Sequence, residues 1–278
     1  MSNRLATLWS LTIMTAGGHL RSPRTLAMVA LLLLFIPGGS WGLSDPAASV
    51  TAQLSADTPY EILYLVSVFV LFSSTLGVVL LGFDGISRKR LTGELAIELS
   101  QPIPRFDLAL SQLLGLWWAV FLPTMIASFL GVILIHVRMD DWPTSYELLL
   151  FLVSTALVIL WYSGLQLLVS SVAKDFGTSI TLGVGMWMGF TLIWLLITAL
   201  LAAAMGVDVT DTLSEEYDSF TEMVDLFSPN GVYQLILESG LHADARPSVG
   251  SGAIGLSALL WTFVPSYLFV RRMASLRP

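Results

Sequence analysis

Long stretches without any charged side chain dominate this sequence and limit what it can fold into. Six of them contain no Asp, Glu, Lys or Arg, and they lie between Arg24 and Asp45, Glu61 and Asp84, Asp107 and Arg138, Glu147 and Lys174, Asp175 and Asp208, and Arg246 and Arg271. Each can hold a helix of about 20 residues, the length that crosses ~30 Å of hydrocarbon. Helices satisfy their backbone polar groups internally, as lipid demands. We therefore predict an all-α integral membrane protein with six transmembrane helices.

The composition supports this class and excludes several others. Only 12% of the 278 residues are charged and 55% are hydrophobic, whereas soluble domains carry about a quarter charged residues. The sequence contains no cysteine, so disulfides, thiolate metal sites and Cys nucleophiles are excluded. The net charge of −7 gives no support to a nucleic-acid partner.

The charge-free stretches divide the chain into spans and connecting segments. We interpret the whole as one transmembrane domain over residues 1–278. The predicted spans are 25–43, 62–83, 108–137, 148–173, 178–205 and 251–270. Residues 1–24 combine apolar residues with arginines and no acid, which predicts an interfacial helix at the membrane surface. Residues 84–107 connect the second and third spans. Residues 206–250 form an acidic segment with short amphipathic pieces that we expect either to dip into the outer leaflet or to cap the bundle.

The distribution of basic residues predicts the orientation. With the N-terminus inside and six alternating spans, 11 of the 13 Lys and Arg residues lie on the inner side, and 15 of the 20 Asp and Glu residues lie outside. Basic residues are enriched in cytoplasmic loops of membrane proteins. The sequence thus predicts a multi-pass protein of the cell membrane with both termini in the cytoplasm.

The fifth predicted span contains Gly185 and Gly189, spaced as Gly-x-x-x-Gly. Such spacing allows close approach of helix backbones. We interpret it as packing within the chain rather than a seam between two copies, although the pattern permits both.

The predicted membrane interior lacks the chemistry of several transporter and enzyme classes. None of the spans has a charged residue near its middle, whereas ion-coupled transporters commonly place ionisable residues there. No pair of His or carboxylate residues has metal-ligand spacing on a helix face, and no Gly-x-x-x-x-Gly-Lys-Ser/Thr phosphate cradle occurs. Energy for any active transport must therefore come from another polypeptide, docked at the inner side.

The inner segment 84–107 is the only one large enough to receive such a partner. It contains a basic cluster, Arg88-Lys89-Arg90. This cluster is followed by Gly93-Glu94-Leu95 and by Leu99-Ser100-Gln101-Pro102-Ile103-Pro104-Arg105. Gly93 permits a break between short helices, and the two prolines end the second one. Together with Asp84 at the end of the second span, this segment resembles the first cytoplasmic loop of ABC-2 type permeases. It departs from that pattern at Lys89, where an acid is common, and at Pro104, where Ser is common. The outer segment Ser228-Pro229-Asn230-Gly231-Val232-Tyr233 also resembles the Asn-Pro-x-x-x-Tyr-type segment of permeases associated with nitrous-oxide reductase maturation.

The resemblance implies an ABC-2, type V exporter-like permease fold and a role as the membrane subunit of an ATP-binding cassette transporter. A separate ATPase subunit would bind ATP and Mg, and this chain would bind no cofactor and would not be an enzyme. The implied coupling residues are Asp84, Arg88, Lys89, Arg90, Gly93, Glu94, Pro102 and Arg105. Two copies, or one copy with a related chain, would form the path, with Ser73, Ser74, Thr75 and Thr191 as candidate liners.

Two other interpretations fit the sequence. The basic cluster could serve only to obey the charge rule and contact anionic lipid, although this leaves the Gly-Glu-Leu and Pro-x-Pro-Arg framing unexplained. The chain could also be a non-transporting scaffold or assembly factor that binds a partner through its acidic outer segment. Neither the substrate nor the direction of transport follows from the residues.

Overall fold

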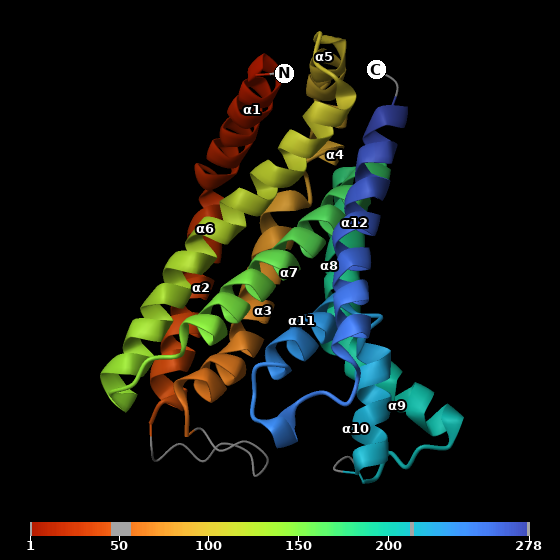
Figure 1. Cartoon of the computed structure of the whole chain (residues 1–278). Coiled ribbons are helices and arrows are strands. Elements are labelled where there is room, and N and C mark those ends of the chain that lie inside the picture. Colours follow the sequence, from red (N-terminus) through yellow and green to blue (C-terminus); the bar gives the residue numbers. More distant parts are fainter. Residues whose placement is uncertain (1, 46–56, 212–213, 277–278) are drawn as a thin grey trace.

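The structure is a computed structural model that describes residues 2–45, 57–211 and 214–276. The described residues form helices joined by short connections, with no strand among them. Six helical segments within them are long and apolar enough to cross a membrane, which confirms the predicted all-α membrane fold. The chain enters α1 and leaves α12 at the same end of the bundle, as an even number of spans requires (Figure 1).

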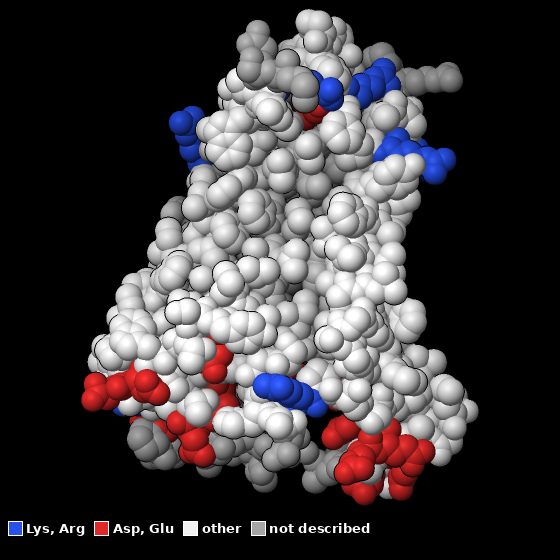
Figure 2. Space-filling model, in the orientation of Figure 1, with Lys and Arg blue, Asp and Glu red and all other residues white. Residues whose placement is uncertain are grey.

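Charge is divided between the two ends of the molecule. Figure 2 shows most of the visible Lys and Arg side chains at the end where α1 begins and α12 ends, and the Asp and Glu side chains mainly at the other end. An uncharged belt separates the two groups on this face. We name these the basic end and the acidic end.

The N-terminal helix α1 (Ser2–Leu20) leads into the first span, α2 (Pro23–Leu43), through a short turn. Pro23 occupies the first turn of α2, where its missing N–H leaves no bond unmade. Helix α1 packs along α6. At the contact, Gly115 of α6 has no room for a side chain, because a Cβ there would lie 2.5 Å from the Cβ of Thr15. The position of α1 at a membrane surface stays a prediction.

Helix α3 (Pro59–Gly82) is the centre of the bundle. Of its most apolar 18-residue window, 67% is buried, against 11% for the fifth span. It packs on α2, α6 and α7. Thr58 and Glu61 begin it with a reciprocal capping box, in which each side chain accepts from the other residue's backbone N–H.

Two short helices, α4 (Ser87–Leu91) and α5 (Glu94–Ser100), follow α3 at the basic end. The third and fourth spans are α6 (Arg105–Met139) and α7 (Ser145–Val172). They also pack on each other.

The fifth span is interrupted. It consists of α8 (Phe176–Met188), a π-helical turn η1 (Gly189–Ile193) and α9 (Trp194–Met205). Figure 1 shows α9 turning away from the bundle after this break. The Gly185 and Gly189 pair does not mediate packing among the described residues, because a Cβ at either would meet no atom within 4 Å. Our interpretation of that pair as an internal packing motif is therefore wrong. The inward glycine of α8 is Gly183, against the Gln166 side chain.

At the acidic end lie α10 (Glu215–Asp225), α11 (Pro229–Glu238) and a 3-10 turn η2 (Ala243–Ala245), before the sixth span, α12 (Ser251–Ser275). Helix α11 contacts α3, α7, α12 and η1. It therefore packs among the ends of the spans.

A candidate coupling site at the basic end

The turn that follows α3 is fastened to two other spans by serine hydroxyl groups. The Phe83 carbonyl oxygen accepts hydrogen bonds from Ser170 of α7, at 3.0 Å, and from Ser179 of α8. The Ser170 oxygen in turn accepts from the backbone N–H groups of Ile86 and Ser87, at 3.1 and 3.2 Å. The start of α4 is thereby tied to both α7 and α8.

Asp84 is held inside the chain by an ion pair. Its carboxylate is buried and accepts two hydrogen bonds from the guanidinium of Arg24 on α2, at 2.8 and 3.0 Å. Arg88 lies 3.7 Å from the same carboxylate. The Arg24 guanidinium also stacks over the Phe83 ring, 4.5 Å from its centroid. This bidentate geometry is among the strong forms of ion pairing, so Asp84 braces α2 against α3.

Two further arginines bind the ends of helices. Arg90 of α4 donates to the carbonyl oxygens of Ser171 and Ala173 at the end of α7, at 2.8 and 3.1 Å. Arg105, at the start of α6, donates to those of Ala274 and Leu276 at the end of α12, at 2.8 and 2.6 Å. The last carbonyls of a helix lack intrahelical partners and carry partial negative charge. Both arginines therefore act as anchors.

The two short helices are braced against each other across a glycine. Gly93 has φ +81, a left-handed conformation that favours glycine, and it ends α4 and begins α5. Lys89 and Glu98 close the angle with an ion pair of 2.6 Å. Burial and, secondarily, the positive charge of Lys89 lower the pKa of the nearby His19 to about 4, so this histidine is neutral near pH 7.

The N-terminal helix joins the same assembly. The guanidinium of Arg4 donates two hydrogen bonds of 2.7 Å to the carboxylate of Asp107, in the first turn of α6. Polar contacts of residues 83–107 at the basic end thus connect the following helices: α1, α2, α4, α5, α6, α7, α8 and α12.

Several side chains of the short helices remain exposed. Leu91 is 60% and Ile97 64% exposed, and Glu94 and Pro102 are also on the surface. The Arg88 side chain is 64% exposed despite its contact with Asp84. We name the exposed residues Arg88, Leu91, Glu94, Ile97 and Pro102 the cap surface. Its exposed apolar side chains among polar ones make this surface a candidate for docking a partner.

The chain matches the family model described as ABC-2 family transporter protein over residues 18–272. It belongs to the ABC-2 family of transporter proteins. No curated protein matches the chain. The likeness to permeases of nitrous-oxide reductase maturation stays a prediction, because the match is to the family as a whole.

The structure of this ABC-2 permease divides the predicted coupling residues into two groups. Arg88, Glu94 and Pro102 are exposed, whereas Asp84, Lys89, Arg90 and Arg105 use their charged groups for contacts within the chain. Sequence reasoning did not find the partners of the second group. Only the pairing of Arg24 with Asp84 had a signal, since opposite charges stand at the basic ends of two consecutive spans.

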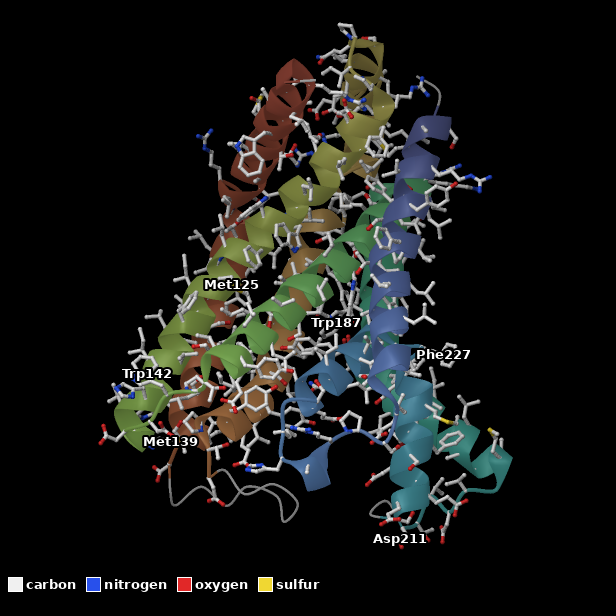
Figure 3. All side chains as sticks on the ribbon, in the orientation of Figure 1. Met125, Met139, Trp142, Trp187, Asp211 and Phe227 are labelled. Atoms are coloured by element: carbon white, nitrogen blue, oxygen red, sulfur yellow. The ribbon has the colours of Figure 1, made fainter. Side chains whose placement is uncertain are left out.

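The predicted path residues occupy two places in the permease. Ser73, Ser74 and Thr75 are completely buried in α3. The Thr75 hydroxyl accepts from the indole N–H of Trp187 at 2.9 Å, and Figure 3 shows Trp187 at the middle of the bundle. Thr191 lies in η1 and is partly exposed. A path lined by the α3 residues would have to run through this subunit, and their role as liners stays a prediction.

A group of polar contacts at the acidic end was missed by the sequence reasoning. Asn230 of α11 accepts a hydrogen bond from the Tyr162 hydroxyl of α7 at 2.7 Å. Its amide donates to the Phe190 carbonyl oxygen at 3.0 Å and lies 3.3 Å from the Thr191 hydroxyl oxygen, both in η1. A π-turn leaves carbonyls without their usual partners, and Asn230 supplies one. The sequence marks residues 228–233 only by a family resemblance, which does not predict these bonds.

Partly buried acids lie beside this contact. Asp225, the last residue of α10, accepts from the indole N–H of Trp194 at 2.8 Å. Burial, with a contribution from Glu222, raises the pKa of Asp225 to about 6. Burial likewise raises the pKa of Glu238, which accepts from the Tyr64 hydroxyl at 2.6 Å. Within the described ranges, no three His, Cys, Asp or Glu side chains are grouped to hold a metal ion.

Proposed function

We propose that this chain is the membrane subunit of an ATP-driven exporter and that a separate ATP-binding subunit docks on the cap surface of α4 and α5. ATP and Mg would be bound by that subunit. The chain would sit in the cell membrane with its basic end in the cytoplasm, as the charge rule favours.

The observation that carries the proposal is the way the inner segment is fastened. Arg90 ties α4 to α7, Asp84 ties the turn before α4 to α2, and Arg105, which follows α5 at the start of α6, ties that start to α12. A force applied to α4 and α5 can reach the spans through these contacts. A loop that only contacted lipid headgroups would need none of these bonds. An element that transmits the motion of a partner into the spans needs them all.

The test separates docking from transmission. The permease is co-purified with the ATP-binding subunit encoded nearest to its gene, and ATP hydrolysis is measured on the assembled complex. Ile97→Asp and Glu94→Arg change the cap surface and should weaken association about tenfold or more, because burying an isoleucine contributes about 1.5–3 kcal/mol. Arg105→Gln should leave association intact but reduce transport-coupled hydrolysis.

The matched control is Val209→Asp, an apolar-to-acid change at the acidic end, where the valine is 36% exposed. It should leave association unchanged. If Ile97→Asp and Val209→Asp bind the ATPase equally well, docking on the cap surface is wrong. Failure of the wild-type permease to bind any ATP-binding subunit would instead favour the scaffold function, with the exposed acids of residues 208–218 as its partner surface.

Two copies of the chain, or one with a related chain, would complete the transporter. The free Gly185 and Gly189 positions support this, because they offer a place where another helix can approach α8 closely. Substituting both by leucine and measuring the mass of the purified complex tests this contact.

A further inference from the structure

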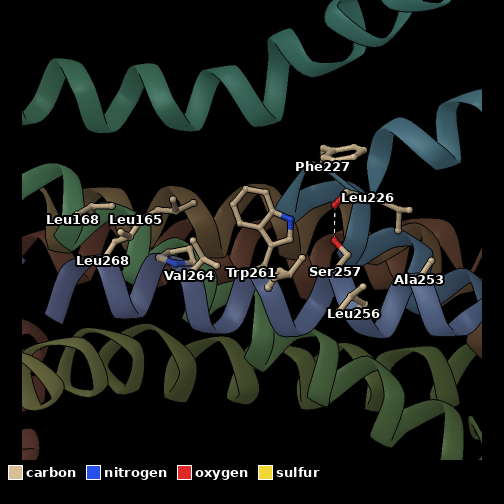
Figure 4. Close-up of a pocket in the computed structure, with 12 residues that line it drawn as sticks. Leu165, Leu168, Leu226, Phe227, Ala253, Leu256, Ser257, Trp261, Val264 and Leu268 are labelled. Atoms are coloured by element: carbon tan, nitrogen blue, oxygen red, sulfur yellow. Dashed lines mark hydrogen bonds between the residues drawn. The ribbon is translucent and has the colours of Figure 1, made fainter. Parts of the chain in front are cut away.

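An apolar groove runs along α12 on the outside of the bundle. It has a volume of about 470 Å³, and its walls are almost entirely carbon. Leu165 and Leu168 of α7 line one side, and α12 lines the other with residues from Ala253 to Leu268. Figure 4 shows these side chains in order along α12, with Trp261 at the middle. The volume falls within the range of ordinary ligand pockets, about 300–1,000 Å³.

The end of the groove nearer the acidic end is bounded by apolar side chains. Leu226 and Phe227, in the turn between α10 and α11, line it beside Ser257. The Ser257 hydroxyl donates to the Leu226 carbonyl oxygen, which fixes this turn against α12. The Ser257 hydroxyl, the polar side-chain group that lines this end, is used in that bond. We therefore place the polar part of an amphiphile in this groove at the opposite end.

The opposite end leads to two arginines. Leu256, Leu260, Val264 and Leu268 line the groove at helical spacing, and the same stripe continues after Leu268 to Arg271 and Arg272, three and four residues on. Both arginines are exposed, and their guanidinium groups have no hydrogen bond or ion pair with any described residue. Free positive charge therefore stands one turn beyond the apolar channel.

We propose that this groove binds an anionic phospholipid, with one acyl chain along α12 and its phosphate at Arg271 and Arg272. The lined stretch of α12 is about 22 Å long at 1.5 Å per residue, enough for a chain that crosses one leaflet of ~15 Å. Basic residues at the cytoplasmic edge of a membrane helix attract anionic headgroups. The site depends only on the membrane fold, not on the ATPase or on the substrate.

The test measures bound lipid by native mass spectrometry of the full-length permease. The protein is presented with phosphatidylglycerol and with phosphatidylcholine of the same acyl chains. Wild type should retain phosphatidylglycerol preferentially. The double variant R271Q/R272Q should lose about 10- to 30-fold of that preference, because each basic residue near an anionic surface contributes about 1 kcal/mol. Arg21→Gln, an exposed arginine between α1 and α2, is the control and should change nothing.

A second variant tests the chain-binding part independently. Leu260→Trp fills the groove and should lower retention of both lipids without changing the preference. Leu259→Trp, on a position of α12 that is 56% exposed and does not line the groove, is its control. An unchanged preference in R271Q/R272Q would overturn the proposal, as would equal retention by the two tryptophan variants. Conversion of dimers to monomers by Leu260→Trp, with lipid retained, would instead identify the groove as a contact between subunits.

Discussion

The basic and acidic ends of this permease are both crossed by short helices, but the two sets of helices are held by different chemistry. At the basic end, α4 and α5 lie beyond the ends of the spans, and charged side chains hold this region by binding helix ends. Arg90 binds carbonyl groups at the end of α7, and Arg105 binds carbonyl groups at the end of α12. At the acidic end, α11 enters the bundle and is held mainly by hydroxyl, amide and backbone groups, including those of Tyr162, Tyr60 and Asn230, with the carboxyl group of Glu238 as the exception. The first arrangement can transmit force through a surface element, whereas the second fixes the ends of the spans.

The burial of the contacts separates the two ends further. The Arg90 and Arg105 contacts are partly open to solvent, which screens them. Asn230 is 8% exposed and Tyr162 is fully buried. A buried polar group that loses its partner has no water to replace it. The acidic end should therefore be the more sensitive to single substitutions.

The largest expected effect comes from Asn230→Leu, which keeps the number and branching of side-chain heavy atoms and removes every hydrogen bond of the amide. It leaves the Tyr162 hydroxyl and the Phe190 carbonyl without partners, at a cost of about 2–5 kcal/mol. The thermal midpoint should fall, and hydrogen exchange should rise in residues 186–194 around η1. Ser239→Ala, at the end of the same helix, is the control, since Ser239 bonds only within its own turn. Unchanged exchange at η1 would show that the π-turn does not depend on Asn230.

This contact also marks what the sequence could not predict. The six spans follow from charge-free windows, because the cost of burying charge in lipid acts on every residue independently. The break in the fifth span cannot be predicted in this way, because Gly189–Ile193 contains no charged residue that would set it apart from its neighbours. Its π-turn is stabilised by the Asn230 amide, which binds the Phe190 carbonyl from 40 residues later in the chain. Asn230 itself stands in a Pro-Asn-Gly run that reads locally as a turn.

At the basic end the sequence predicted the break between two short helices but not the contacts that hold them. Charge, glycine and proline are local signals, and they placed Gly93 at the junction of two short helices, as the φ of +81 confirms. The acceptors of Arg90 and Arg105 are backbone carbonyls, which carry no residue-type signal. A sequence therefore reveals that such arginines are present and not whether they point to a partner or back into the chain.

We expect an effect of intermediate size on stability when the helix-end contacts of Arg90 and Arg105 are removed. Arg90→Met and Arg105→Met keep the aliphatic stem and remove the donors, at a cost of about 1–2 kcal/mol each because the sites are partly solvated. Hydrogen exchange should rise in residues 87–100 in the first variant and in residues 272–276 in the second, while the global thermal midpoint changes little. Arg21→Met, at an exposed position between α1 and α2, should alter neither segment. A global loss of stability in either variant would remove the distinction between the two ends.

The smallest effect is the pH response of the acidic end, on the order of 1 kcal/mol. Asp225 has its pKa raised to about 6 by burial, whereas an unfolded Asp titrates near ~3.9. Between these values the folded state binds more protons than the unfolded state, so the free energy of unfolding falls as pH rises from about 4 to about 6. Glu222 and Asp218 of α10, Glu238 of α11, Tyr64 of α3 and Arg246 line the cavity that Asp225 also faces.

The raised pKa of Glu238 gives the same direction, so Asp225→Asn should reduce the slope without abolishing it. Asparagine retains the oxygen that accepts from Trp194, which separates the loss of charge from the loss of the hydrogen bond. Thermal midpoints measured from pH 4.5 to 7.5 provide the slope for the two proteins. Equal slopes would mean that the charge of Asp225 does not oppose folding. A steeper wild-type slope would show instead that the acidic end, where neutral hydrogen bonds predominate, holds the partly buried carboxylate of Asp225 only at a cost in stability. The ion pairs of the basic end avoid that cost.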